Sequence, residues 1–119
     1  MKKTLVLGAS SNPERYANKA VRKLKKFGHP VVAVGKRPTM IDDTPIIQDF
    51  PSGNGIDTVT LYLNPDNQKE YYQKIIDLHP KRIIFNPGTE NEELEELAKN
   101  NNIETVDACT LVMLSTGEF

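Results

Sequence analysis

The sequence predicts an α/β fold: a single Rossmann-like domain in which helices cover both faces of an open, parallel, five-stranded sheet. Three observations predict it. Short apolar runs alternate with amphipathic segments along the chain. The first apolar run ends at a glycine and leads directly into a helix start, and the 119 residues suit one hydrophobic core. We therefore expect one domain over residues 1–119.

The first strand and the turn after it organise the chain. Thr4–Leu7 is β-prone and uninterrupted, as is typical of a strand buried on both faces. Gly8 permits a tight turn. Ser11 with Glu14 matches a capping box, while Asn12 before a proline matches a cap followed by proline at the first helical position. With either cap, free N–H groups at the helix start can bind a phosphate.

The next two elements complete a β-α-β unit. Residues 16–27 have apolar residues at helical spacing and end at Gly28, the usual place of a C-terminal cap. Residues 30–34 form the second strand. Lys36 and Arg37 follow this strand, where a dinucleotide fold contacts the adenosine ribose. Cations there suit a phosphorylated ribose, and the alternative is a pair of solvated loop charges.

The second half of the chain repeats the strand-to-helix pattern. Residues 40–55 read as a long loop with one brief strand or turn around residues 46 and 47. A strand over residues 57–63 leads into a helix capped by Asn64 with Pro65 at its first position. A strand over residues 81–85 leads through a turn containing Asn86 and Gly88 into a further helix, for which Thr89 and Glu92 form a capping box.

The strand order follows from these runs. Counted along the chain, the strands cover residues 4–7, 30–34, 57–63, 81–85 and 103–106. We expect the order 3-2-1-4-5 around the first strand. Ligands bind such sheets at the carboxyl ends of the strands, beside the point where the order reverses.

Composition excludes several classes of function. The formal net charge of −1 argues against nucleic acid as a partner. No apolar run approaches the roughly 18 residues that span a bilayer, so we expect no membrane partner and a cytoplasmic location. One cysteine, Cys109, and two histidines provide no zinc-ligand pattern, so no metal is expected. Cys109 is predicted to be a small buried residue.

The segment GASSNPERY at residues 8–16 resembles the opening of the small stand-alone CoA-binding proteins, relatives of the CoA-binding domain in the succinyl-CoA synthetase α subunit. The resemblance implies that CoA is the cofactor and that Asn64, Pro65 and Gly88 lie near it. These proteins usually carry Asn-Pro after the second strand, where this chain has glycine followed by Lys36 and Arg37. The residues expected to bind the ligand are Gly8, Ala9, Ser10, Ser11, Asn12, Arg15, Tyr16, Lys36, Arg37, Asn64, Pro65, Asn86 and Gly88.

We therefore expect a non-catalytic module that binds CoA or an acyl-CoA, with its pyrophosphate at the turn over residues 8–13. One alternative is an NADP-binding, oxidoreductase-like domain, because a 2′-phosphate would also use Lys36 and Arg37. The other is a scaffold that binds a protein partner and no nucleotide. The exposed edge of the predicted sheet also permits a homodimer.

Overall fold

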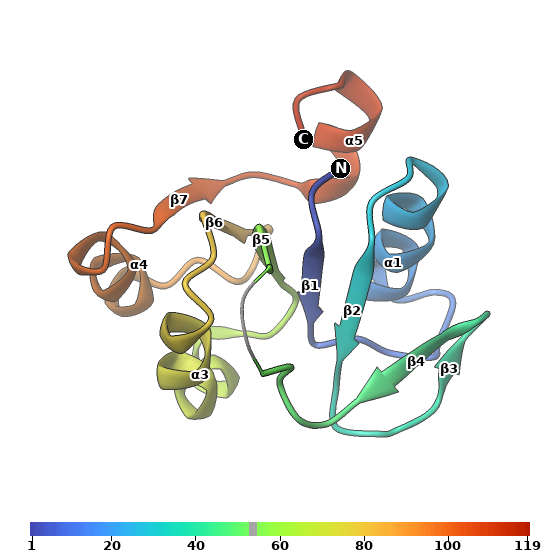
Figure 1. The fold of residues 1–119 in the computed structure, drawn as a ribbon, viewed down its shortest axis with the longest axis horizontal. Helices are drawn as coiled ribbons and strands as arrows, with labels where there is room; N and C mark the ends of the chain where they lie inside the picture. Colours follow the sequence, from blue (N-terminus) through green and yellow to red (C-terminus); the bar gives the residue numbers. More distant parts are fainter. Residues whose placement is uncertain (53–54) are drawn as a thin grey trace.

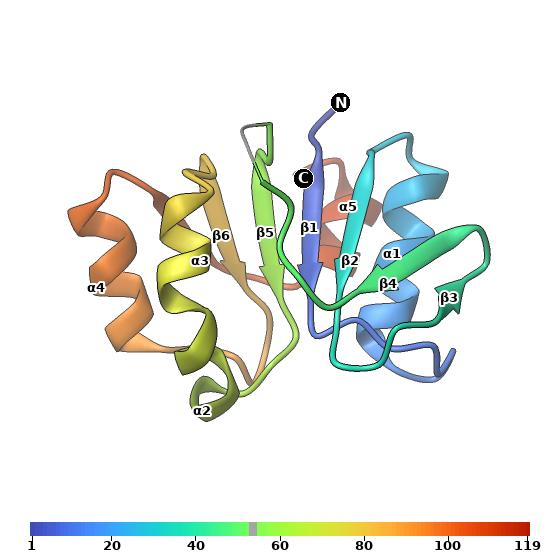
Figure 2. The same cartoon turned by 60° about the horizontal axis from the view of Figure 1, so that its bottom comes forward.

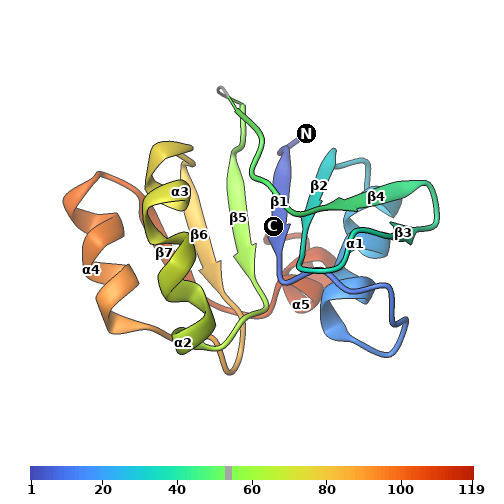
Figure 3. The same ribbon diagram turned by 90° about the horizontal axis from the view of Figure 1, so that it is seen from below.

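A seven-stranded sheet runs through the computed structural model, which describes residues 1–52 and 55–119 (Figure 1). Its strands are β1 (Thr4–Leu7), β2 (Val31–Val34), β3 (Met40–Ile41), β4 (Thr44–Ile47), β5 (Thr58–Leu61), β6 (Arg82–Phe85) and β7 (Glu104–Asp107). The helices are α1 (Tyr16–Lys26), α2 (Pro65–Gln68), the single 3-10 turn η1 (Lys69–Tyr71), α3 (Tyr72–Asp77), α4 (Glu92–Asn100) and α5 (Thr110–Thr116). Helices α1 and α5 cover one face of the sheet, and α3 and α4 cover the other (Figures 1 and 3).

Strand β1 lies at the centre of the sheet, and all four of its residues are buried. It pairs in parallel with β2 on one side and with β5 on the other. Because side chains alternate along a strand, Leu5 and Leu7 pack toward α3 and α4, whereas Val6 packs toward α1 and α5. The uninterrupted apolar run in the sequence reflects these two cores.

The predicted sheet is wrong in strand number, orientation and order. Among the described residues the order is β3-β4-β2-β1-β5-β6-β7, and β3 is antiparallel to β4. The strand expected beyond β2 is β5, and it pairs with β1 instead. The outer edge of β2 is occupied by β4, whose Ile46 and Ile47 pair with Ala33 and Val34. The brief strand anticipated near residues 46 and 47 is therefore part of a hairpin, while residues 53 and 54 of the predicted loop lie outside the described residues.

The capping boxes predicted for α1 and α4 are also wrong. Helix α1 begins only at Tyr16, because Asn12 forms a local turn in which its side chain accepts the Glu14 N–H at 3.0 Å. Helix α4 is capped by Asn91, whose side chain accepts the Leu94 N–H at 3.2 Å. The predicted cap of α2 is confirmed, since the Asn64 side chain accepts a backbone N–H at 2.9 Å.

Helix α5 was not predicted, and it packs beside α1. Cys109 immediately precedes it and is partly exposed, so the prediction of a buried cysteine is wrong. Within residues 1–52 and 55–119, no helix has the length and apolar character needed to cross a bilayer.

A buried side-chain amide links α5 to the sheet through hydrogen bonds. Asn86, which is 3% exposed, follows β6 directly. Its Nδ2 donates to the Thr60 hydroxyl at 2.7 Å and to the Leu61 carbonyl at 2.8 Å, and its Oδ1 accepts the Thr110 N–H at 2.9 Å. One side chain thus joins the ends of β5 and β6 to the start of α5.

We predict that Asn86→Ala lowers the free energy of unfolding by about 2 to 4 kcal/mol, because it leaves buried backbone groups of Leu61 and Thr110 without partners. Urea denaturation followed by circular dichroism measures the change. Asn101→Ala removes an exposed amide whose one side-chain hydrogen bond within residues 1–52 and 55–119 is to the Leu97 carbonyl, and it should cost no more than about 0.5 kcal/mol. Equal losses in the two variants would contradict the prediction.

Candidate functional site

Two adjoining hollows lie over the carboxyl ends of β1, β2, β5 and β6. These strand ends form the lower edge of the sheet in Figure 2. The first has a volume of about 370 Å³ and the second about 640 Å³. Both are lined by Gly8, Ser10, Arg15, Arg37 and Leu63. We call the two hollows together the groove. It crosses the junction of β1 and β5, where connections leave the sheet in opposite directions.

Gly8 turns the chain at the centre of the groove. Its φ of +96° disfavours any residue with a side chain. A Cβ atom there would also lie 3.0 Å from the Leu63 side chain. The N–H groups of Gly8 and Ala9 both donate to the Val34 carbonyl at 2.9 Å. They fix the turn against β2 and are not available to a ligand.

The free backbone donors lie in the turn itself, before the helix start at which the sequence predicted them. Within the described part of the chain, the N–H groups of Ser10 and Ser11 have no hydrogen-bond partner. Both residues line the first hollow. The turn over residues 8–12 therefore presents backbone N–H groups and serine hydroxyls to the groove, a combination suited to an anion.

Gly35 was not among the predicted site residues, yet the turn depends on it. A Cβ atom at this position would lie 2.4 Å from the Ala9 carbonyl oxygen, which is well inside contact distance. The missing side chain lets the turn after β1 approach the end of β2. A glycine directly after a buried strand and before two cations was the available sequence signal.

The groove has an excess of positive charge. Arg15 and Arg37 are exposed and line both hollows, while Lys36 lines only the first. The Lys36 Nζ atom lies 4.0 Å from a Glu70 carboxylate oxygen, so part of its charge is balanced within the chain. Among the lining residues, all of them in the described ranges, there is no Asp, Glu, His or Cys.

Tyr62 forms part of the second hollow, but its hydroxyl faces inward. The phenol oxygen is buried and makes no hydrogen bond within the described residues. Burial raises the pKa of Tyr62 to about 12, an effect that the nearby Thr60 and Thr110 hydroxyls only partly oppose. Those two hydroxyls bond to one another at 2.8 Å.

Most of the predicted site residues meet in the groove. Two do not line it: Asn86 lies buried beneath it, and Pro65 begins α2 beside it. The residues brought together as predicted are Gly8, Ala9, Ser10, Ser11, Asn12, Arg15, Tyr16, Lys36, Arg37, Asn64 and Gly88. Those that sequence reasoning missed are Ala17, Gly35, Thr39, Tyr62, Leu63, Asn67, Tyr71, Pro87 and Thr89. No three His, Cys, Asp or Glu side chains gather as a metal site within residues 1–52 and 55–119.

A comparison with protein families matches residues 2–115 to the CoA binding domain. The chain belongs to the CoA-binding domain family. The family assignment agrees with the resemblance at residues 8–16 and supports CoA, a small molecule, as the ligand of this CoA-binding domain. No curated protein matches the sequence.

Solved structures share the fold of this CoA-binding domain. An uncharacterized protein of known crystal structure is 54% identical, with a TM-score of 0.97 over 100% of this chain and 98% of its own. A hypothetical protein from Pyrococcus horikoshii OT3 is 26% identical, with a TM-score of 0.84 over 97% of this chain and 82% of its own. A protein from Thermus thermophilus, 21% identical with a TM-score of 0.84 over 99% of this chain and 90% of its own, shares the fold alone.

We predict that Gly35→Ala lowers the free energy of unfolding by about 1 to 3 kcal/mol, because the added methyl group collides with the Ala9 carbonyl. Gly117→Ala serves as the matched control. Gly117 has a φ of +77° and open space around it, so alanine there should cost about 1 kcal/mol through backbone strain alone. Urea denaturation compares the two, and a smaller loss for Gly35→Ala would contradict the steric argument.

We also predict that Tyr62→Phe does not destabilise the domain at pH 7, because the lost hydroxyl has no partner among the described residues. Tyr72→Phe should cost about 1 kcal/mol, because it removes the acceptor of the Asn91 side chain.

The Tyr62→Phe variant should also change the pH dependence of stability. Folded Tyr62 keeps its proton up to a pKa of about 12, whereas the unfolded chain loses it near pH 10, so the free energy of unfolding of the wild type falls between these pH values. The fall should be shallower in Tyr62→Phe. Denaturation midpoints measured from pH 8 to pH 11 test both points, and identical slopes would refute the second.

Proposed function

We propose that the groove binds CoA or an acyl-CoA without transforming it, with the pyrophosphate over the turn at residues 8–12. The observation that carries the proposal is that Gly8, Ser10 and the arginines at 15 and 37 line both hollows. A ligand with two extended ends and a doubly charged centre suits this arrangement. CoA has that form, with adenosine on one side of its pyrophosphate and pantetheine on the other.

The centre of the groove supplies the groups that a pyrophosphate requires. The free N–H groups of Ser10 and Ser11 can donate to its oxygens, and Arg15 can approach with a planar pair of donors. Hydrogen bonds to charged groups contribute about 1.5 to 3 kcal/mol each. The late start of α1 at Tyr16 leaves the turn long enough for such donors to face one side.

The two ends of the groove differ in chemistry. The first hollow has Lys36 in addition to the shared Arg37, and these two cations suit the 3′-phosphate on the ribose of CoA. Because Lys36 lies near Glu70, we assign the main phosphate contact to Arg37. The second hollow is lined by amide and hydroxyl side chains beside apolar ones, which matches the alternating amides and methylenes of pantetheine.

A binding role without catalysis is supported by the composition of the lining. General acid–base and nucleophilic catalysis rely mostly on His, Cys and carboxylates, and none of these lines either hollow in the described part of the chain. NADP is the second candidate, since its 2′-phosphate could use the same cations near Arg37.

We predict that CoA binds more tightly than dephospho-CoA or NADP in isothermal titration. Arg37→Ala should weaken CoA binding by about tenfold or more, the effect of one charge-assisted hydrogen bond, and Lys36→Ala by less. Arg37→Ala should weaken dephospho-CoA binding by a smaller factor than CoA binding, because that ligand keeps the pyrophosphate but lacks the 3′-phosphate.

Lys81→Ala controls for the loss of one positive charge, since Lys81 is exposed just before the amino end of β6 and far from the groove. It should bind CoA as the wild type does. Absence of CoA binding at millimolar concentration would refute the proposal, and tighter binding of NADP would favour the second candidate.

A further inference from the structure

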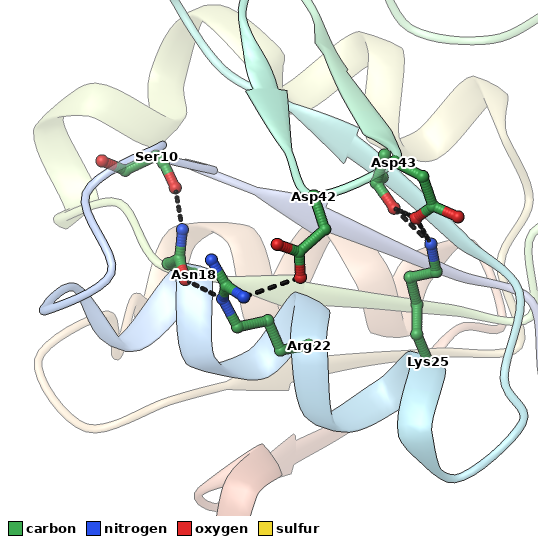
Figure 4. A network of polar contacts seen from close by, with 7 residues as sticks. Ser10, Asn18, Arg22, Lys25, Asp42 and Asp43 are labelled. Carbon is green, nitrogen blue, oxygen red and sulfur yellow. Dashed lines mark hydrogen bonds and ion pairs between the residues drawn. The ribbon is translucent and has the colours of Figure 1, made fainter.

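Asn18 lies beneath the turn and has no place in the groove itself. It is fully buried on the inner face of α1, although its side chain is polar. Its Nδ2 donates to the Ser10 carbonyl at 2.9 Å, and its Oδ1 accepts from Arg22 Nε at 2.7 Å (Figure 4). Arginine has only donors, so the amide oxygen must face Arg22. The amide nitrogen is thereby directed to Ser10.

The bond to Ser10 fixes a peptide plane that borders the groove. In a trans peptide, the carbonyl of one residue and the N–H of the next point in opposite directions. Because the Ser10 carbonyl is held by Asn18, the Ser11 N–H is directed away from α1. This N–H has no partner in the described part of the chain, and Ser11 lines the first hollow.

We propose that Asn18 is a positioning residue that orients the peptide between Ser10 and Ser11 for a diphosphate, with Arg22 holding the Asn18 amide in the required direction. This inference rests on the proposed function and adds to it a residue that the ligand does not touch. The same two hydrogen bonds also satisfy the polar atoms of a side chain that is fully buried.

The chain of contacts continues to the hairpin of β3 and β4. Arg22 Nη1 lies 2.6 Å from the Asp42 carboxylate, and Lys25 pairs with the adjacent Asp43 (Figure 4). The two ion pairs join the same helix to the same hairpin turn. Arg22 also donates a hydrogen bond to the Asn18 side chain, whereas the Lys25 ion pair involves Asp43 alone among the carboxylates of the described residues. Lys25 therefore provides a matched control on α1.

The test compares Arg22→Met with Lys25→Met, each of which removes one positive charge and one ion pair to the hairpin. The probes are ADP, which carries a diphosphate, and adenosine 3′-phosphate, which does not. Dissociation constants come from amide chemical shifts in two-dimensional NMR, which reads millimolar affinities. Arg22→Met should weaken ADP binding several-fold and adenosine 3′-phosphate hardly at all, while Lys25→Met should leave both nearly unchanged.

Asn18→Ala gives a second measurement. It should weaken ADP binding by about tenfold, the size of one hydrogen bond to a charged group, and shift the Ser11 amide resonance in the free protein. Equal weakening of both probes by Arg22→Met would overturn the inference, because a general loss of structure would do the same. Unchanged ADP binding in Arg22→Met would also overturn it. If the wild type binds neither probe nor CoA, the proposed function itself fails and this inference fails with it.

Discussion

The close approach of the turn after β1 to the end of β2 is the constraint on which the site depends. One carbonyl, that of Val34, accepts the N–H groups of both Gly8 and Ala9. This approach requires that Gly35 carry no side chain, because the Ala9 carbonyl occupies the space that a Cβ atom would fill. Because the Ala9 carbonyl lies against Gly35, the Ser10 N–H of the same trans peptide points to the opposite side.

The sequence was sufficient to predict elements with a strong local signal. Four buried residues in β1, a glycine after them and the Asn64 cap of α2 are local features, and the structure has all of them. The strand order could not be read in this way. It depends on whether the short apolar stretch at Ile46 pairs with β2, which is a contact between segments separated in the sequence. Because that pairing forms, β5 cannot occupy the outer edge of β2 and pairs with β1.

Local sequence signals also predicted which residues gather around the groove, although whether these residues bind a ligand stays a prediction. Residues that directly follow strands were placed correctly in the groove, since parallel strands end at one edge. Asn86 follows a strand too, but its side chain is used entirely by Thr60, Leu61 and Thr110. Asn18 gave no signal, because a single asparagine in an amphipathic helix does not reveal which carbonyl it contacts.

The two hollows of the groove are built from different parts of the chain, and these parts are synthesised at different times. The first hollow is built from residues 8–39 except for Leu63 and Tyr71, so nearly all of it comes from the β-α-β unit and the loop after it, which are synthesised before β5 and β6. The second hollow needs the ends of β5 and β6, which are distant in sequence and form contacts later. A nascent chain would therefore contain nearly all residues of the first hollow before those that complete the second.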